Sequence, residues 1–196
     1  MEAIGERAGK MRFSFDTRHA ETARKILDCH FRGGNKKREV FINDVSGNPD
    51  DAMAAVVKEY GAALIVMHAL TVPANPKVTI SEHEDAVEVV YAWAGRMLEK
   101  HGDAIIIDPG IGFGKTAAQS LAIIRNTARI KSLGAKVMVG HSRKSFLSLF
   151  TANKAAGRDR ETLVVSTYLV KQGVDYLRVH DVKSHAVMMR IVVALS

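Results

Sequence analysis

Asp108 stands where a run of isoleucines meets a glycine-rich turn, in the stretch Ala104-Ile-Ile-Ile-Asp-Pro-Gly-Ile-Gly-Phe-Gly-Lys-Thr116. The isoleucines are β-branched and lack polar alternation, which is typical of a parallel strand covered on both faces. Gly110, Gly112 and Gly114 let the backbone adopt a positive φ or approach a ligand closely. A carboxylate beside such a loop predicts a recognition site, whereas a tight strand-to-helix turn is the plainer alternative for the same glycines.

Two well-known glycine loops do not fit this stretch. The phosphate loop G-x-x-x-x-G-K-[ST] needs a glycine at position 109, which is Pro109, although Gly114-Lys115-Thr116 matches the end of that motif. The dinucleotide fingerprint G-x-G-x-x-G needs a third glycine at position 115, which is Lys115. The loop therefore belongs to neither class of nucleotide site.

Polar residues that can bind or catalyse also follow the other apolar runs. They are Asp16, Asn43, His68, Ser142 to Ser145, Arg178 and His180. Arg178 and His180 are two residues apart on a predicted strand, so their side chains share a face, and the fixed fork of an arginine suits a phosphate. His68 has no second histidine or acid at ligand spacing nearby, so we interpret it as a strand-end histidine rather than a metal ligand.

Six successive strand and helix units position these residues, and such regular alternation predicts parallel strands with right-handed crossovers. In a (β/α)8 barrel the carboxyl ends of all strands point to one mouth, whereas a doubly wound sheet joins only the residues beside its switch point. Polar residues at all six strand ends favour an α/β fold of the TIM-type (β/α)8 barrel class, incomplete with six units. Residues 1–11 are expected to be a lead-in, and residues 12–196 one barrel domain.

Capping signals predict where the helices begin and end. Asn48 is predicted to cap a helix that has Pro49 at its first position and ends at Gly61. Ser81 and Glu84 have the spacing of a capping box for the next helix. We also predict a helix from Ala117 to Leu133 and an apolar helix through Phe146, Leu149 and Phe150.

Composition limits the function classes. With 196 residues, 47% of them hydrophobic, the chain is long enough for one substantial core. Its net charge of +7 suits an anionic small molecule, and nucleic acid is disfavoured because the densest basic cluster is Lys36-Lys37-Arg38 and only 6% of residues are aromatic. Cys29 is the only cysteine, which excludes an internal disulfide. Since the sequence shows no signal core and no spanning apolar run, we expect no membrane association and a cytoplasmic location.

Six segments, taken in order, resemble the strand-end motifs of the dihydropteroate synthase family. They are Phe15-Asp16-Thr17, Ile42-Asn43-Asp44-Val45-Ser46-Gly47, Met67-His68, Asp108-Pro-Gly-Ile-Gly-Phe-Gly-Lys115, Gly140-His-Ser-Arg-Lys-Ser145 and Arg178-Val-His-Asp181. The resemblance runs from about Arg12 to the C-terminus, and the Asp108 and Ser142 motifs are its most specific part. Six motifs in the right order are stronger evidence for the resemblance than any single motif.

The resemblance implies a transferase of folate synthesis, a target of sulfonamides. Such an enzyme condenses hydroxymethyl-dihydropterin pyrophosphate with para-aminobenzoate to give dihydropteroate and pyrophosphate, usually with Mg²⁺. Its pterin pocket would be lined by Asp16, Asn43, Met67, Asp108 and Lys144. The chemistry of these residues agrees, because a pterin edge with amino, ring-nitrogen and carbonyl groups needs carboxylate and amide partners in a buried slot.

The same resemblance assigns the other two ligands. Arg178 and His180 would hold the pyrophosphate, whose departure leaves positive charge on the exocyclic carbon. Ser145 would bond to the aminobenzoate, and the ring of Phe113 would pack against it. The catalytic groups implied are Lys144, Arg178 and His180.

The sequence departs from the family at its start. The family's first two strand and helix units carry an Asn-Val-Thr-Pro-Asp-Ser-Phe segment and a Ser-Thr-Arg-Pro-like segment, and neither string occurs here. In the family these segments supply the metal-binding asparagine and much of the aminobenzoate site. We therefore assign no residue of this chain to Mg²⁺, and we expect a complementing chain or a homodimer as partner.

Two further functions stay open on the sequence. One is a non-catalytic pterin-binding module, or an inert synthase fragment that keeps the pterin-facing half of the site. The other is a pterin-dependent methyltransferase on the same barrel type, although Ser142-Arg-Lys144 and Arg178-Val-His180 favour the synthase. Because six strands cannot close such a barrel, we expect open edges at Phe13–Phe15 and Leu177–Val179, and interior apolar side chains exposed to water.

Overall fold

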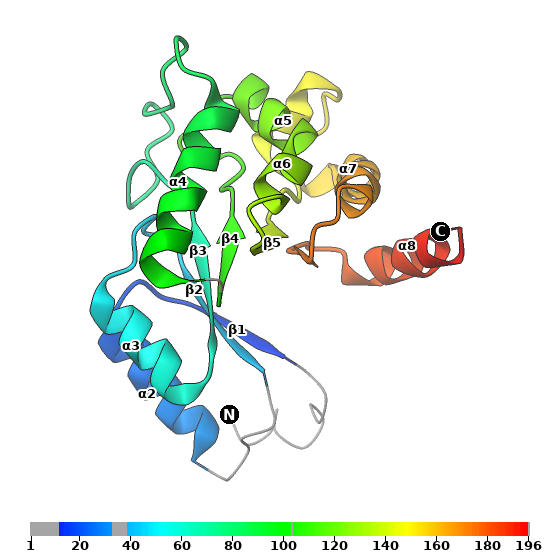
Figure 1. Ribbon diagram of the computed structural model, residues 1–196. Coiled ribbons are helices and arrows are strands. Elements are labelled where there is room, and N and C mark those ends of the chain that lie inside the picture. The colour runs from blue at the N-terminus through cyan, green and yellow to red at the C-terminus, as the bar shows by residue number, and fades with distance from the viewer. Residues whose placement is uncertain (1–11, 33–38, 103, 196) are drawn as a thin grey trace.

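Strands and helices alternate along the chain (Figure 1), in a computed structural model that describes residues 12–32, 39–102 and 104–195. The predicted lead-in, residues 1–11, lies outside these ranges. The strands are β1 (Phe13–Asp16), β2 (Val40–Asp44), β3 (Ala63–Met67), β4 (Ile105–Asp108), β5 (Lys136–Val139) and β6 (Tyr176–Leu177). The helices are α2 (Ala20–Phe31), α3 (Asp51–Tyr60), α4 (Ala86–His101), α5 (Ala117–Arg125), α6 (Thr127–Lys131), α7 (Asp159–Lys171) and α8 (Val182–Ala194), with 3₁₀ turns η1 (Ser145–Leu149) and η2 (Ala155–Gly157).

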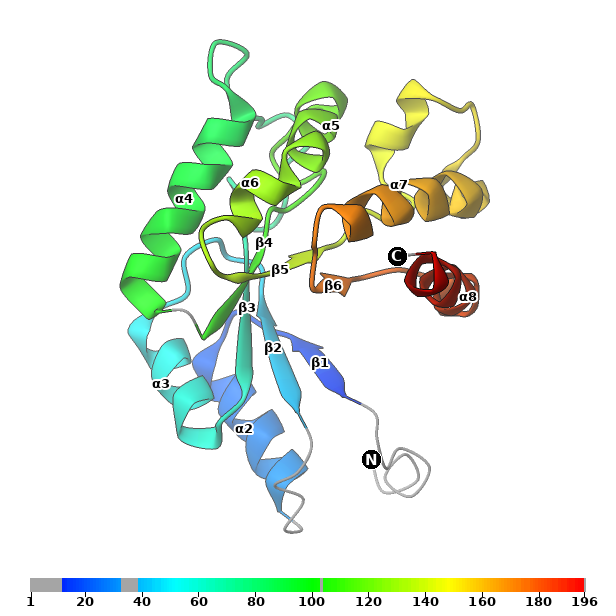
Figure 2. The same ribbon diagram turned by 45° about the vertical axis from the view of Figure 1, so that its right-hand side comes forward.

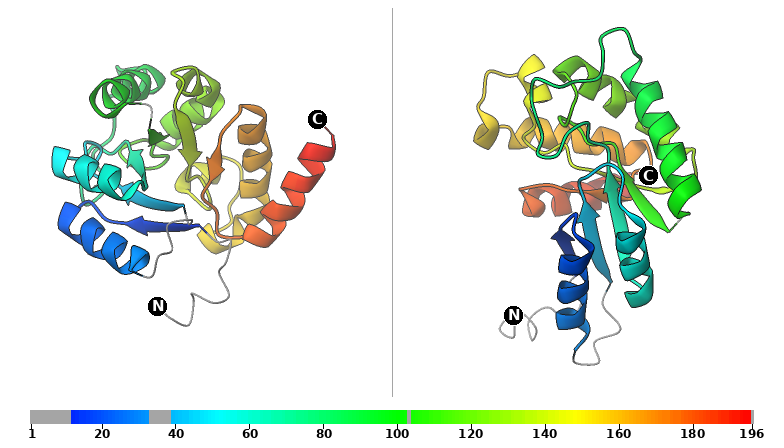
Figure 3. Two further views of the ribbon diagram at one scale, coloured as in Figure 1. Left: turned by 60° about the horizontal axis from the view of Figure 1, so that its bottom comes forward. Right: turned by 90° about the vertical axis from the view of Figure 1, so that its left-hand side faces the viewer.

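The six strands form one parallel sheet in the order β1 to β6, so each strand pairs with the next along the chain. The sheet curls, and Figure 3 (left) shows the helices in an arc around its outer side from α2 to α8. Helical crossovers between adjacent parallel strands are the arrangement of a (β/α) barrel wall. The predicted class, a TIM-type barrel with six of its units present, is confirmed.

Side chains of β2 to β5 alternate between two buried faces, as expected for parallel strands. One set packs outward under the helices, for example Ile42, Val66 and Ile107. The other set forms a small inner cluster, which we define as Phe41, Ile65, Ile106 and Met138. The outer core fixes the helices on the sheet, and the inner cluster forms the floor below the strand ends.

The inner cluster is not exposed to water, contrary to the expectation from six strands. Its members are at most 7% exposed. The curl of the sheet explains this, because it brings β6 toward β2, where the ring of Tyr176 meets Phe41 edge-on at 5.6 Å between centroids. Large apolar side chains are exposed instead on α8, for example Val193, and at its C-cap, Leu195.

Two of the predicted helix caps are wrong. The cap of α3 is Asp50, whose carboxylate accepts the N–H of Met53, and not Asn48. The cap of α4 is Asp85, whereas Ser81 forms a turn with the N–H of His83. In both cases an aspartate closer to the helix supplies a charged acceptor to the free N–H groups. The predicted stop of α3 at Gly61 is confirmed.

The predicted helix from 117 to 133 is divided into α5 and α6, because Asn126 interrupts the helical backbone. Its start shows a full capping box between Thr116 and Gln119. The apolar helix predicted through Phe146 is only a 3₁₀ turn, η1. Figure 2 shows η1, η2 and α7 together beyond the end of β5.

Among residues 12–32, 39–102 and 104–195, no helix has both the length and the hydropathy needed to cross a bilayer.

Candidate active site

Side chains at the carboxyl ends of the strands continue the inner face of the sheet. Two residues beyond the members of the inner cluster stand Asn43, Met67, Asp108 and Gly140, and side chains two apart on a strand share a face. The register pairs Asp16 with Asn43 and Met67 with Asp108. The fold therefore gathers four of the predicted pterin residues above the inner cluster. We call these four, Asp16, Asn43, Met67 and Asp108, the inner layer.

Asp108 presents a buried carboxylate with one unused oxygen. Its Oδ1 accepts the N–H of Gly110 at 2.8 Å, while its Oδ2 has no hydrogen-bond partner among the described residues. Burial raises the pKa of Asp108, opposed by the Gly110 hydrogen bond and by the positive charges of Arg178, Lys144 and Lys115. An unpaired buried oxygen is costly in the free protein, which is typical of an atom reserved for a ligand.

Asn43 supplies a second acceptor. Its Nδ2 donates to Asp16 Oδ1 at 2.7 Å, which orients the amide so that Oδ1 faces away from Asp16. This oxygen is also buried and without a partner in the described part of the chain. Asn43 and Asp108 thus offer two acceptors to a ligand that carries N–H donors along one edge.

Arg178 lies between two carboxylates of this layer. Its guanidinium is 3.8 Å from Asp108 Oδ2 and 3.9 Å from Asp16 Oδ1, too far for a hydrogen bond to either. It packs against Gly140, where an added Cβ would stand 3.1 Å from both Nε and Nη2. The fork of Arg178 is therefore held in place yet keeps its donors for an anion.

Lys144 lies over the face of the Phe113 ring, with Nζ 3.7 Å from the centroid. Burial lowers the pKa of Lys144 to about 8, against the attraction of Asp108 and with the repulsion of Arg178. Ring and ammonium come from the loops after β4 and β5, so this cation–π contact joins the two loops.

Lys115 is a buried amine that was not among the predicted site residues. Its Nζ contacts His68 Nδ1 at 2.8 Å, the Phe113 carbonyl at 2.9 Å and the Gly110 carbonyl at 3.1 Å. A Cβ at Gly110 would overlap the carbonyl oxygen of His68, which explains why the loop needs glycine there. Lys115 therefore fixes the loop that follows Asp108 onto the end of β3.

His68 connects this loop to the outer helices. Burial and the neighbouring Lys115 lower the pKa of His68 to about 3, so the ring is neutral. The indole of Trp93 meets the ring of His68 edge-on at 5.0 Å, and Trp93 Nε1 donates to the Gly47 carbonyl at 2.7 Å. His68 thus serves as the neutral acceptor beside Lys115.

The low pKa of Lys115 predicts that the stability of the protein rises with pH. Burial lowers the pKa of Lys115 from 10.5 to about 7, against the attraction of Asp108. Above pH 7 the unfolded chain therefore binds about one proton more than the folded chain, which adds ~1.4 kcal/mol per pH unit up to the unfolded pKa. The charged amine donates to His68 Nδ1, and the neutral amine can keep this contact by accepting from Nδ1–H once the ring changes tautomer.

Urea unfolding of the natural protein and of Lys115→Met, between about pH 6 and 9, measures this effect. The free energy of unfolding of the natural protein should rise relative to the variant above about pH 7 and run parallel to it below. Lys58→Met, on the exposed face of α3, is the control and should leave the pH dependence unchanged. Parallel curves for Lys115→Met over the whole range would show that Lys115 titrates normally.

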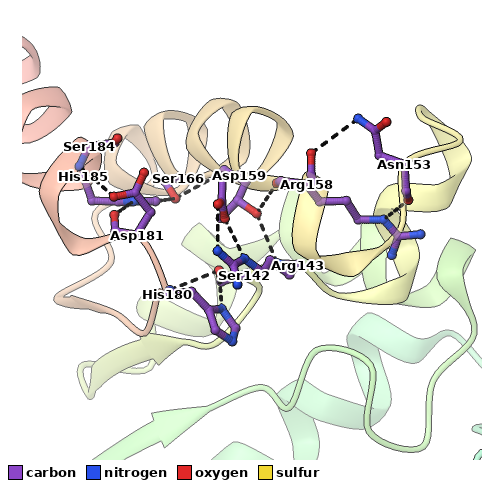
Figure 4. Close-up of polar contacts among 12 residues, drawn as sticks. Ser142, Arg143, Asn153, Arg158, Asp159, Ser166, His180, Asp181, Ser184 and His185 are labelled. Atoms are coloured by element: carbon purple, nitrogen blue, oxygen red, sulfur yellow. Dashed lines mark hydrogen bonds and ion pairs between the residues drawn. The ribbon is translucent and has the colours of Figure 1, made fainter.

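The loop after β6 places Arg178 and His180, although not on a strand as predicted, because β6 ends at Leu177. Arg178 still donates its backbone N–H to the Val139 carbonyl at 3.1 Å. Figure 4 shows His180 bonded to Ser142, from the loop after β5. The same figure shows Arg143 paired through two 2.7 Å hydrogen bonds with Asp159 of α7, as a structural anchor.

Most of the predicted site residues lie together, while His180 lies further along the loop after β6 and Ser145 lies in η1. The strand ends and the loops after β4, β5 and β6 bring together Asp16, Asn43, Met67, Asp108, Phe113, Lys144 and Arg178. Ser145 is exposed at the first position of η1, and no described residue bonds to its side chain, so its contact with aminobenzoate stays a prediction. Lys115 and Ser142 were missed as supporting residues, although both belong to the quoted motifs.

Magnesium does not fit the residues that the structure describes. No group of three or more histidine, cysteine, aspartate or glutamate side chains in the described ranges is arranged to hold a metal ion. Asp16 and Asp108 both face Arg178, which competes for their oxygens.

The arrangement has counterparts in known proteins. The family described as pterin binding enzyme matches residues 1–180. The folate synthesis bifunctional protein of Chlamydia caviae is 35% identical over 179 residues, which are 88% of this chain and 38% of that protein. The dihydropteroate synthase of Anaplasma phagocytophilum, solved with 6-hydroxymethylpterin-monophosphate, is 34% identical with a TM-score of 0.79, covering 93% of this chain and 71% of that one.

A third relative is the dihydropteroate synthase of Thermus thermophilus in complex with 4-aminobenzoate. It is 30% identical with a TM-score of 0.78, covering 93% of this chain and 73% of that one. The chain spans well under half of the Chlamydia protein and about seven tenths of the two solved synthases. The chain therefore belongs to the pterin-binding enzyme family, as a dihydropteroate synthase-like member that spans part of the length of its relatives.

Proposed function

We propose that this chain provides the pterin and pyrophosphate half of a dihydropteroate synthase active site. The reaction joins hydroxymethyl-dihydropterin pyrophosphate to para-aminobenzoate and releases dihydropteroate and pyrophosphate. The observation that carries the proposal is the pair of buried, unpartnered acceptors, Asp108 Oδ2 and Asn43 Oδ1, beside the two cations Lys144 and Arg178. Acceptors for one edge of a ring and cations for its charged substituent are what this substrate requires.

The pterin would lie on the inner layer. Its amino and ring N–H groups would donate to Asp108 and Asn43, and Lys144 would donate to a ring nitrogen or carbonyl. Met67 and the inner cluster would form the apolar floor. Asp16, which accepts from Asn43, holds the amide in the orientation that this binding needs.

The pyrophosphate would lie against Arg178 and His180. When the aminobenzoate nitrogen attacks the exocyclic carbon, the bond from that carbon to the pyrophosphate oxygen breaks, and the nitrogen then loses a proton. Positive charge grows on the carbon and negative charge on the leaving oxygen. A guanidinium and an imidazole fixed beside that oxygen stabilise the transition state more than the ground state.

The aminobenzoate would bind at the outer end of the site, against the Phe113 ring and the hydroxyl of Ser145. The Thermus synthase was solved with 4-aminobenzoate, which supports this ligand class for the family. We also propose that sulfonamides inhibit this reaction. We also propose a cytoplasmic location and completion of the sheet by another polypeptide or a second copy of this chain.

A second candidate function is pterin binding without catalysis. The open edges at β1 and β6 favour it, because the strands beyond them would carry further parts of the site. Turnover by the completed assembly would separate the two functions.

Arg178→Ala tests the pyrophosphate assignment. We expect it to weaken binding of the pyrophosphorylated pterin by about tenfold to a hundredfold, because charged hydrogen bonds contribute ~1.5–3 kcal/mol. Binding of plain hydroxymethyl pterin should change by less than about twofold, since Arg178 is not bonded to the pterin-facing acceptors. Calorimetry with both ligands measures the difference.

Arg125→Ala is the matched control, because it removes the same charge from an exposed position on α5. It should leave both affinities unchanged. Equal losses for the two ligands in Arg178→Ala would refute the assignment of Arg178 to the pyrophosphate.

A further inference from the structure

Ser142 and His180 join the loops after β5 and β6 through two hydrogen bonds (Figure 4). The backbone N–H of His180 donates to Ser142 Oγ at 3.3 Å. The same oxygen is 2.8 Å from Nδ1 of the His180 ring. Ser142 is only 5% exposed, so its hydroxyl group must find its partners inside the protein.

Counting protons decides the direction of the second bond. A serine hydroxyl has one hydrogen to donate and two lone pairs to accept with. Ser142 Oγ already accepts the N–H of His180, and no other acceptor for its hydrogen lies within bonding distance in the described chain. The hydrogen therefore goes to Nδ1, which must carry a lone pair. The neutral ring of His180 then has its proton on Nε2.

Helix α7 holds the loops after β5 and β6 in place around this bond. On the β5 side, the N–H of Arg143 donates to Thr162 Oγ1 at 3.1 Å. On the β6 side, His185 Nδ1 bonds the Asp181 carbonyl at 2.6 Å, and its Nε2 meets Ser166 Oγ at 2.7 Å. Because α7 anchors the residues next to both partners, the distance from Ser142 to His180 is set by the fold.

We propose that Ser142 is a positioning residue that fixes the Nε2–H tautomer and the orientation of the His180 ring. His180 is exposed on its other side, so Nε2–H is available to a ligand. A neutral imidazole fixed in this way donates one hydrogen bond to an anionic oxygen, and its Nε2 cannot accept a proton or bind a cation. The ligand class is a pyrophosphate ester, and this part rests on the proposed function.

Nitrogen NMR of the ligand-free protein tests the tautomer without any substrate. In ¹⁵N-labelled protein at alkaline pH, long-range correlations of the His180 ring should show a protonated Nε2 and an unprotonated Nδ1. His180→Gln assigns the signals. Ser142→Ala should give a mixture of tautomers, and Ser142→Thr, which keeps the hydroxyl, should restore the single form. A protonated Nδ1 in the natural protein, or no change in Ser142→Ala, would overturn the proposal.

Binding then tests the consequence for the ligand. Ser142→Ala should weaken the pyrophosphorylated pterin by about tenfold, the effect of one hydrogen bond, and Ser142→Thr should not. In the His180→Gln background the Ser142→Ala change should add no further loss, because Ser142 acts through His180. Additive losses would contradict this role.

The two proposals fail in different ways. If plain hydroxymethyl pterin does not bind the natural protein, the proposed function is wrong, and the tautomer result still stands on its own. If the pterin binds but the tautomer is not the one expected, the function stands and the role of Ser142 is wrong.

Discussion

Asp108→Ala is expected to abolish pterin binding at concentrations where the natural protein is saturated. The carboxylate is 1% exposed, and its Oδ2 has no partner in the described residues of the free protein. Without it, the N–H donors of the pterin edge would be buried and unpaired. Truncating one side of a buried, charged hydrogen-bonded pair costs about 2–5 kcal/mol, or ~30-fold to several thousandfold in affinity.

Calorimetry with hydroxymethyl pterin measures this loss, and circular dichroism shows whether the variant is folded. Asp51→Ala is the matched control, since Asp51 is on the solvent side of α3 with its side chain 96% exposed. Asp108→Asn separates charge from shape, and we expect it to lose most of the affinity because an amide offers one acceptor oxygen in place of two. Unchanged affinity in a folded Asp108→Ala protein would sink the pterin assignment.

The second expected result is that a polypeptide of these 196 residues, alone, makes no dihydropteroate. Its sheet ends at β1 and β6, which leaves a row of unpaired N–H and C=O groups on each edge. Ser145, which the resemblance assigns to aminobenzoate, has no partner side chain among the described residues to hold it. Orientation of the nucleophile can account for ~7–11 kcal/mol of a barrier, so turnover should fail although the pterin binds.

The assay is dihydropteroate formation by the purified polypeptide, with and without a second polypeptide that supplies two further strand and helix units. Rescue by the second polypeptide is expected, together with a lower tendency of the first to associate in sedimentation. The inner cluster is already buried, so the added units should complete the site more than they stabilise the core. Robust turnover by the 196 residues alone would falsify this prediction.

The sequence was informative wherever apolar runs ended in polar side chains. Each run became a strand of the sheet, and period-two geometry placed Asn43, Met67 and Asp108 on one face. Predicting that these side chains lie together required only the order of the apolar runs, because parallel strands place their carboxyl ends at the same edge of a sheet regardless of the helices that connect them. This is why the inner layer was predicted and its details were not.

Helix α7 shows why other parts could not be predicted. Its buried residues are Thr162, Ser166 and Leu169, so two of the three are polar and the apolar periodicity that marks a helix is hidden. The polar side chains are buried because Thr162 bonds to the loop after β5 and Ser166 bonds to His185 of α8. Ser142 and Lys115 were missed for a related reason, because their roles depend on partners 38 and 47 residues away.

Trp93 gives this protein a built-in optical reporter. It is the only tryptophan in the chain, and its indole is buried between the Gly47 carbonyl and the ring of His68. His68 contacts Lys115, and Lys115 holds the loop that follows Asp108. Indole fluorescence therefore comes from Trp93 alone, which is connected through His68 and Lys115 to the loop beside the proposed pterin carboxylate, Asp108. Pterins absorb in the near ultraviolet where indole emits, so ligand occupancy could be followed by quenching in the unmodified protein, with no dye attached.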